Sequence, residues 1–178
     1  KTKEPIENIA KEYVSEEKGV TDVKEAIDGA KDIIAESISD EADFRSWIRR
    51  ITMKKGNLTS AAKKPEEESV YEMYYEFEEP VSKLAGHRML AGNRGEKEKI
   101  LNVKLTAPEE DILRYLEKQI IHTENPYTTP VLKEVVEDSY KRLIAPAIER
   151  EIRSELTERA EDGAIEVFGK NLHQLLMQ

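Results

Sequence analysis

The residues of this chain that could do chemistry are scattered carboxylates, three histidines and a modest number of basic side chains. His87, His122 and His173 have no second histidine and no convincing carboxylate at the i+3 or i+4 spacing at which a helix presents metal ligands. His122 stands at an expected helix end, where a cation interacts favourably with the helix dipole. The sequence therefore predicts no metal site and no histidine that acts as a general base.

Carboxylate pairs recur along the C-terminal segment, for example Glu151 with Glu155. Glycoside hydrolysis needs two carboxylates that face each other across a pocket, and two on one solvated helix face do not meet that need. Arginines are interleaved with these acids, which favours ion pairs along the helix, each worth a few tenths of a kcal/mol. The chain has no cysteine, phosphate loop, dinucleotide fingerprint or nucleophile elbow. We therefore expect no catalytic residue, no cofactor and no enzyme activity.

Two groups of basic residues are candidates for contact with an anion such as a nucleic-acid phosphate. The first lies around Asn93-Arg94-Gly95, a turn signal that could expose backbone amides, and contains His87, Arg88, Arg94 and Lys97. The alternative is that its arginines join helices by bonding carbonyls and carboxylates. The second group is diluted by acids, so internal pairing is the favoured interpretation; it contains Lys141, Arg142, Arg150 and Arg153. From these groups we select five candidate contacts: Arg88, Arg94, Lys97, Lys141 and Arg142.

The composition favours a mainly helical protein. Charged residues make up 37% of the chain, hydrophobic residues 38% and aromatic residues only 6%. A long helix can display charge over most of its surface and bury one stripe, whereas sheets need more β-branched and aromatic residues. The net charge of −9 argues against a surface that coats nucleic acid. No apolar run approaches the length of a membrane span, and we expect a cytoplasmic protein without membrane contact.

Hydrophobic periodicity predicts a multi-helix bundle with at most a two- or three-stranded β element. Helices are expected over 5–19 and 21–38, with Ser39 capping a third, and again over 66–77, 81–91 and 108–121. Leu101, Val103 and Leu105 alternate with polar residues and predict a strand, whose partner we place around 58–62. The predicted segments are an N-terminal helical bundle over 1–53, a helical insert with the β element over 54–130, and a long C-terminal helical segment over 131–178.

The C-terminal segment carries apolar residues at steps of four, from Ile148 to Leu176. Each step turns about 400° around the helix, so this stripe drifts by about 40° per step. Either different partners cover the stripe along its length, or the helix is kinked or broken. The expected points are Pro146 and Gly163. The apolar end at Leu176 suggests continuation into, or packing against, a further domain, and we interpret the chain as a piece of a longer protein.

Four stretches, in this order, carry a family resemblance: Gly29–Glu36 (GAKDIIAE), His87–Glu96 (HRMLAGNRGE), Asp138–Arg153 (DSYKRLIAPAIEREIR) and Ala164–Leu176 (AIEVFGKNLHQLL). Together they resemble the bacterial Tex family of transcription accessory proteins. Each stretch alone is a weak signal, but their order over nearly the whole chain is specific.

The resemblance implies a much longer protein with an N-terminal helical region, an RNase H-like domain, helix-hairpin-helix motifs and a C-terminal S1 domain. This chain resembles the helical region that precedes the RNase H-like domain. It implies nucleic-acid binding linked to transcription and kinship with a eukaryotic elongation factor. In such proteins the S1 and hairpin modules are the main nucleic-acid binders. The resemblance assigns no catalytic residue to this region.

Two functions remain as hypotheses. In the first, the chain is a scaffold that positions the downstream RNase H-like, helix-hairpin-helix and S1 modules, and nucleic acid binds mainly through those modules. In the second, it is a protein-interaction module that docks RNA polymerase or other transcription proteins through exposed helix faces. Under the first hypothesis, the chain alone binds nucleic acid weakly or not at all. Any residual binding should weaken with salt and with Arg88→Ala plus Arg94→Ala.

Overall fold

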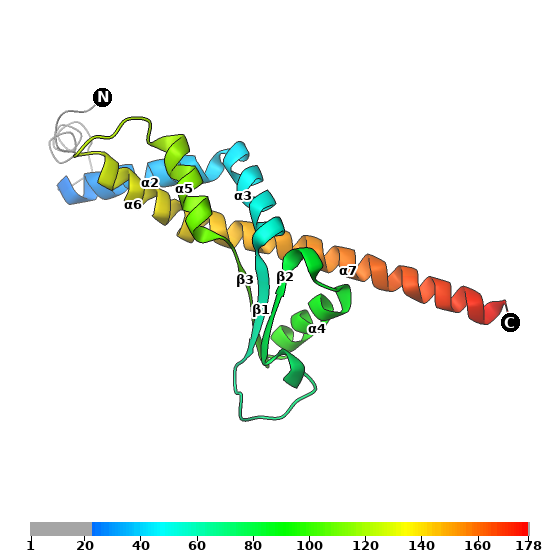
Figure 1. The fold of residues 1–178 in the computed structure, drawn as a ribbon. Coiled ribbons are helices and arrows are strands. Elements are labelled where there is room, and N and C mark those ends of the chain that lie inside the picture. The colour runs from blue at the N-terminus through cyan, green and yellow to red at the C-terminus, as the bar shows by residue number, and fades with distance from the viewer. Residues whose placement is uncertain (1–22, 178) are drawn as a thin grey trace. The chain divides into compact units, whose positions relative to one another are not determined.

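The computed structural model describes residues 23–177, so the helix expected over 5–19 lies outside the described residues (Figure 1). The chain forms two compact units, which we describe separately. Unit 1 contains residues up to Ile48 together with Glu109–Ile148, and unit 2 contains Arg49–Pro108 and Glu149–Gln178. Among residues 23–177, no helix is both long and apolar enough to cross a membrane. The predicted class, mainly α with one small sheet and a long C-terminal helix, is confirmed.

Unit 1 is helical. It contains α2 (Val23–Asp40), the first half of α3 (Ala42–Lys55), α5 (Glu109–Ile120) and α6 (Thr129–Asp138). Helix α6 packs against both α2 and α5. The buried apolar side chains of these helices include Ala26, Ala35, Ile38, Ile48, Ile112, Leu116, Val135 and Val136. The predicted N-cap role of Ser39 is wrong, because Ser39 lies inside α2 and its hydroxyl donates to the carbonyl of Glu36 at 2.8 Å.

A π-helix, η3 (Ser139–Ile144), joins α6 to α7 (Ala145–Leu176). Proline lacks an N–H and its ring clashes with the carbonyl four residues back, so Pro146 cannot extend an ordinary α-helix. A wider turn avoids this conflict, and the Ala145 N–H accordingly donates to the carbonyl of Tyr140, five residues earlier. The discontinuity predicted at Pro146 is thus a change of helix type, and the helical path continues through it.

The π-helix also supplies core contacts within unit 1. The Ser139 hydroxyl is fully buried and donates to the carbonyl of Ala35 on α2 at 2.6 Å. The neighbouring Tyr140 is buried as well, and this burial, with a smaller effect of the Glu109 carboxylate, raises the pKa of its phenol to about 12. At the other side of the unit, the Trp47 ring stacks on Tyr115 with 3.8 Å between the ring centroids.

Unit 2 is built on a three-stranded antiparallel sheet in the order β2-β1-β3. Strand β3 (Leu101–Thr106) pairs with β1 (Asn57–Ala62), so both the predicted strand and its predicted partner are confirmed. The third strand, β2 (Glu76–Pro80), begins at the end of the segment 66–77, and the helix predicted over that segment is wrong. The only helical turn in this segment is the short 3-10 helix η1 (Glu72–Tyr74). Val70 and Met73 would lie on the apolar face of a helix over 66–77, but they are 88% and 67% exposed.

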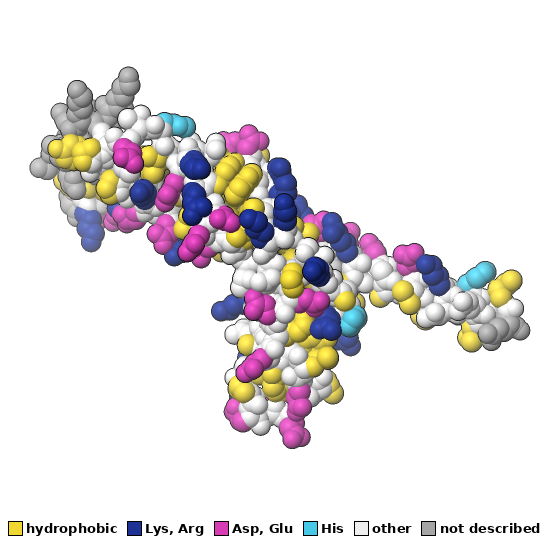
Figure 2. Space-filling model, in the orientation of Figure 1, with side chains coloured by type: hydrophobic (Ala, Val, Ile, Leu, Met, Phe, Trp, Pro, Cys, Tyr) yellow, Lys and Arg dark blue, Asp and Glu magenta, His cyan; other side chains and the backbone are white. Residues whose placement is uncertain are grey.

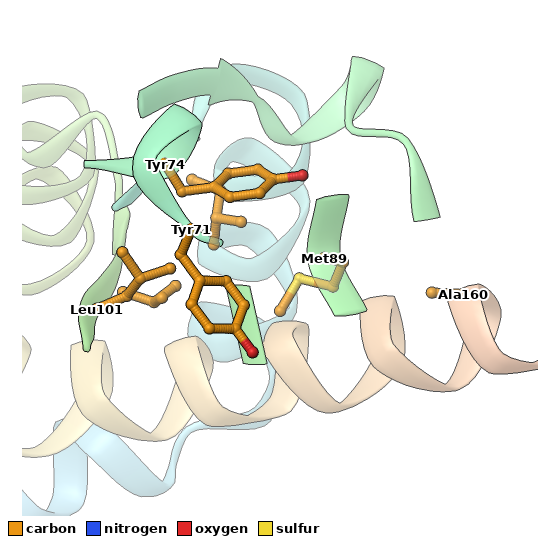
Figure 3. Packing of buried hydrophobic residues seen from close by; sticks show 7 residues of the cluster. Tyr71, Tyr74, Met89, Leu101 and Ala160 are labelled. Carbon is orange, nitrogen blue, oxygen red and sulfur yellow. The ribbon is translucent and has the colours of Figure 1, made fainter. Parts of the chain in front are cut away.

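The core of unit 2 lies between this sheet, helix α4 (Gly86–Lys97) and the part of α7 that belongs to the unit (Figure 3). Its buried members are Leu58, Tyr71, Tyr74, Met89, Leu101, Val103 and Ala160. Tyrosines and strand residues therefore fill the part of the core for which the sequence predicted the apolar face of a helix over 66–77. The buried hydroxyl of Ser60 in β1 donates to the carbonyl of Tyr74 at 2.7 Å, which satisfies both polar groups and fixes η1 against the sheet.

Helix α4 runs through the turn predicted at Asn93-Arg94-Gly95, so that turn does not exist. The helix ends later, where the N–H groups of Lys99 and Ile100 donate to the carbonyls of Glu96 and Gly95 and Lys99 takes a positive φ of 63°. Gly95 serves packing instead: a Cβ there would lie 2.4 Å from Cδ1 of the buried Leu101. A glycine that permits close packing was misinterpreted as a turn signal.

Helix α7 in unit 2 is covered at first and then exposed. Ile152 is fully buried, Leu156 is partly buried, and Ala160 is the last buried residue of the helix. At Ala160 the contact is tight, because a Cβ on Gly86 would lie 3.2 Å from the Ala160 Cα. From Glu161 to Met177 every residue is exposed, although the helix continues without interruption through Gly163. The stripe of apolar residues from Ile148 to Leu176 is therefore covered only as far as Ala160.

Gly95→Ala should destabilise unit 2 by about 1–2 kcal/mol, because overpacking against Leu101 outweighs the gain in helix propensity. Gly163→Ala in the same unit is the matched control, since a Cβ there meets nothing within 4 Å, and it should be stabilising by about 0.5–1 kcal/mol. Urea unfolding followed by circular dichroism measures both. A Gly95→Ala variant as stable as the control would contradict the packing described here.

Candidate functional site

The first candidate basic group lies on α4, and its Arg88 is already engaged. The Arg88 guanidinium lies over the Phe77 ring, 5.4 Å from its centroid, and its Nε is 3.7 Å from Oε2 of Glu79. Both partners belong to β2, so Arg88 joins α4 to the sheet within unit 2. This arrangement matches the structural alternative for Arg88, in which a planar guanidinium links two elements.

The partly buried carboxylate of Glu79 is stabilised by the positive charge of Arg88. Its Oε2 is buried and, among the described residues, has no hydrogen-bond partner. A buried carboxylate oxygen without a donor is costly, and a nearby cation lowers that cost. Arg88 therefore neutralises a half-buried acid of the same unit, which leaves its guanidinium poorly placed to contact an external phosphate.

Arg94 and Lys97 are exposed on α4. Arg94 follows Arg88 by six residues, which places the two side chains about 240° apart around the helix axis. The first group therefore does not form one face, and the backbone amides that a turn would have exposed are inside a helix. Contact of Arg94 and Lys97 with an anion stays a prediction.

Three members of the second candidate group, Lys141, Arg142 and Arg153, pair internally, as the acid content around the group predicts. Lys141 contacts Glu137 at 2.7 Å and Glu109 at 3.4 Å, and hydrogen bonds to these carboxylates raise its pKa. Arg142 contacts Asp138 at 3.0 Å and Asp32 of α2 at 3.4 Å, and the hydrogen bond to Asp138 likewise raises its pKa. Both residues lie in the π-helix of unit 1, where they link neighbouring helices.

Arg153 on α7 is the strongest polar link within unit 2. Its guanidinium donates two hydrogen bonds to Glu96, at 2.7 and 3.2 Å, and a third to Asn93 at 3.3 Å. Asn93 in turn donates to the Thr157 hydroxyl at 2.8 Å. A guanidinium that donates two hydrogen bonds to one carboxylate has a specific geometry. These contacts therefore hold α4 against the covered part of α7. Internal pairing of Arg153 was the favoured interpretation of the sequence, but its partners on α4 were not predicted.

Glu155 accepts hydrogen bonds from Arg49 and from Arg159, so it acts as an ion-pair partner. The three histidines are exposed. Within residues 23–177, no group of three or more side chains is placed to hold a metal ion.

The exposed half of α7 carries an amphipathic pattern. Ile165, Phe168, Leu172 and Leu175 alternate at steps of three and four, which places them on one face, with Leu176 beside them. Ile165 and Leu175 are each 69% exposed. The opposite face carries an ion pair between Lys170 and Glu166 at 3.5 Å. The stripe predicted from the sequence took every fourth residue and therefore did not reveal this alternation of steps of three and four.

Apolar side chains at a helical spacing of three and four are typical of a face that another helix or domain covers. Exposed scattered apolar residues need no explanation, but a continuous face over three turns does. We name the face formed by Ile165, Phe168, Leu172, Leu175 and Leu176 the α7 apolar face.

The chain matches the family model described as Tex central region-like over residues 1–168. It therefore belongs to the Tex family, in the central region of such proteins. It is 56% identical over 172 residues to the uncharacterized protein YdcI of Bacillus subtilis (strain 168), covering 95% of this chain and 24% of that protein. It is 29% identical to the transcriptional accessory protein Tex of Neisseria gonorrhoeae, covering 97% of this chain and 23% of that protein.

A human protein named S1 RNA-binding domain-containing protein 1 is 30% identical over 90% of this chain and 18% of its own length. The chain thus spans about a quarter or less of the length of these relatives. The family predicted from the four stretches is confirmed.

Arg88→Ala should lower the free energy of unfolding of the chain by about 1–2 kcal/mol, because it removes a cation–π contact and leaves the Glu79 carboxylate without its cation. Arg94→Ala is the matched control on the same helix and should change it by less than about 0.5 kcal/mol, since Arg94 is exposed. Thermal and urea unfolding measure both variants. Equal effects of the two substitutions would show that Arg88 has no structural role.

Proposed function

We propose that this chain is a non-catalytic helical frame of a Tex-type transcription accessory protein, and that the α7 apolar face holds a neighbouring nucleic-acid-binding module. The modules expected from the family resemblance are the RNase H-like, helix-hairpin-helix and S1 domains. The name of the human relative, S1 RNA-binding domain-containing protein 1, supports an RNA-binding S1 domain in proteins that contain this region.

The observation that carries the proposal is the exposure of the α7 apolar face on a helix that has nothing packed on it from Glu161 to Met177, within the part of the chain that the structure describes. Burial of one Leu, Ile or Phe side chain stabilises by about 1.5–3 kcal/mol. Covering several of them is therefore a strong driving force for a fixed module. Because the chain spans about a quarter of its bacterial relatives, such proteins contain further chain that can supply the cover.

The charge distribution is consistent with a frame that leaves most nucleic-acid binding to other modules. The net charge is −9, and several arginines within the described units are used in ion pairs with carboxylates of their own unit. Phosphate neutralisation needs cations that are not already neutralised. We propose in the same way that the region contributes no catalytic group of its own.

The test uses a full-length Tex-type protein that carries this region. Phe168→Ser with Leu172→Ser should speed limited proteolysis within 161–177 and weaken nucleic-acid binding about tenfold or more, since the module loses side chains worth several kcal/mol of contact. Val167→Ser is the matched control, because Val167 is 58% exposed on the other side of the helix, and it should do neither. A double variant that behaves like the control would overturn the proposal.

Docking of transcription proteins is a second candidate, favoured by the segment 65–79 of unit 2. This segment contains seven glutamates and no basic residue, and it exposes Val70 and Met73. A basic protein surface with an apolar pocket would complement it. The same experiment separates the two candidates, because docking through 65–79 does not depend on Phe168 or Leu172.

A further inference from the structure

We propose that the C-terminal half of α3 contacts the phosphodiester backbone of nucleic acid through Arg50 and Lys54. The helix carries five basic residues and one acid in 14 residues, within a chain whose net charge is −9. Lys and Arg side chains gather over α3 in Figure 2. None of the five candidate contacts lies on this helix, although its excess of basic residues is visible in the sequence.

The neighbouring cations of α3 are engaged. Arg49 forms an ion pair with Glu155 of α7, and the same carboxylate also pairs with Arg159. Lys55 takes part in an interaction of its own. One carboxylate of unit 2 is thus shared between two guanidinium groups.

Arg50 and Lys54 differ from these residues. Both are exposed, and neither forms an ion pair with any residue that the structure describes. They are four residues apart, which places their Cβ atoms about 5–6 Å apart on one face of the helix. A nucleic-acid strand carries a phosphate about every 3.4 Å along a duplex axis, so both side chains can reach phosphates of one strand at the same time.

The helix dipole offers a simpler explanation for some, but not all, of the basic residues of α3. Basic residues in the last turn stabilise the helix dipole, which accounts for Lys54 and Lys55. Arg50 lies a turn earlier, where the dipole effect has faded, and yet it keeps an unneutralised guanidinium at the surface. The choice of nucleic acid as the anion rests on the proposed function of a Tex-type protein, and the contact would add to the binding by other modules.

The experiment measures fluorescence anisotropy of a labelled single-stranded RNA, and separately of duplex DNA of the same sequence, against the 178-residue chain at low salt. Arg50→Gln with Lys54→Gln is compared with Lys63→Gln plus Lys83→Gln, two exposed lysines outside α3. Both variants remove two positive charges. The α3 variant should bind about tenfold more weakly and should lower the slope of log K against log salt by about 1.4 for RNA, at about 0.7 per phosphate contact. The control pair should change affinity less than about twofold.

Four outcomes would overturn the proposal: no binding by the unsubstituted chain, equal losses in the two variants, a loss confined to Arg94→Gln with Lys97→Gln, or preference for poly-glutamate over nucleic acid. The two nucleic-acid probes show whether the contact favours RNA or DNA, and either result supports it. Thermal unfolding confirms that each variant is folded. Failure here would leave the proposal for the α7 apolar face standing, because that proposal is tested by different substitutions.

Discussion

The burial of helix α7 ends at Ala160, and the proposed function depends on this boundary. Up to that residue, unit 2 covers the helix with α4, through the tight contact of Gly86 with Ala160 and the hydrogen bonds of Arg153. Beyond it, the α7 apolar face is exposed. A continuous apolar face of this kind on a folded protein indicates a partner surface. We propose that this exposed half of α7 is the surface that the chain offers to another module.

Ion pairs inside each unit engage part of the basic side chains of the described residues. In unit 1, Lys141 and Arg142 each contact two carboxylates, and in unit 2 Arg153 binds Glu96. Most of these pairs are partly exposed and contribute little stability each. Their consequence is electrostatic, because they remove basic side chains that a sequence alone would count as available to phosphate. Arg50 and Lys54 of α3 form no such pair with the described residues.

The sequence was informative where a local pattern determines the structure. Alternation at Leu101, Val103 and Leu105 predicted β3, and the need of a lone strand for a partner predicted β1. It failed where tertiary contacts override local signals: Tyr71 and Tyr74 are buried by the sheet, so 66–77 forms no long helix, and Leu101 requires the glycine at 95. The neutralisation of Arg88 by Glu79 joins separate elements, and no spacing in the sequence encodes it.

Hydrogen–deuterium exchange of the backbone amides of 161–177 tests the central claim most directly. The measurement compares the 178-residue chain with a full-length Tex-type protein that carries it. A helix end without tertiary cover opens readily, whereas a covered one exchanges only through larger unfolding. The account predicts fast exchange in the isolated chain and protection at least about a hundredfold greater in the full-length protein, centred on Phe168 and Leu172. Equal, fast exchange in both proteins would contradict it.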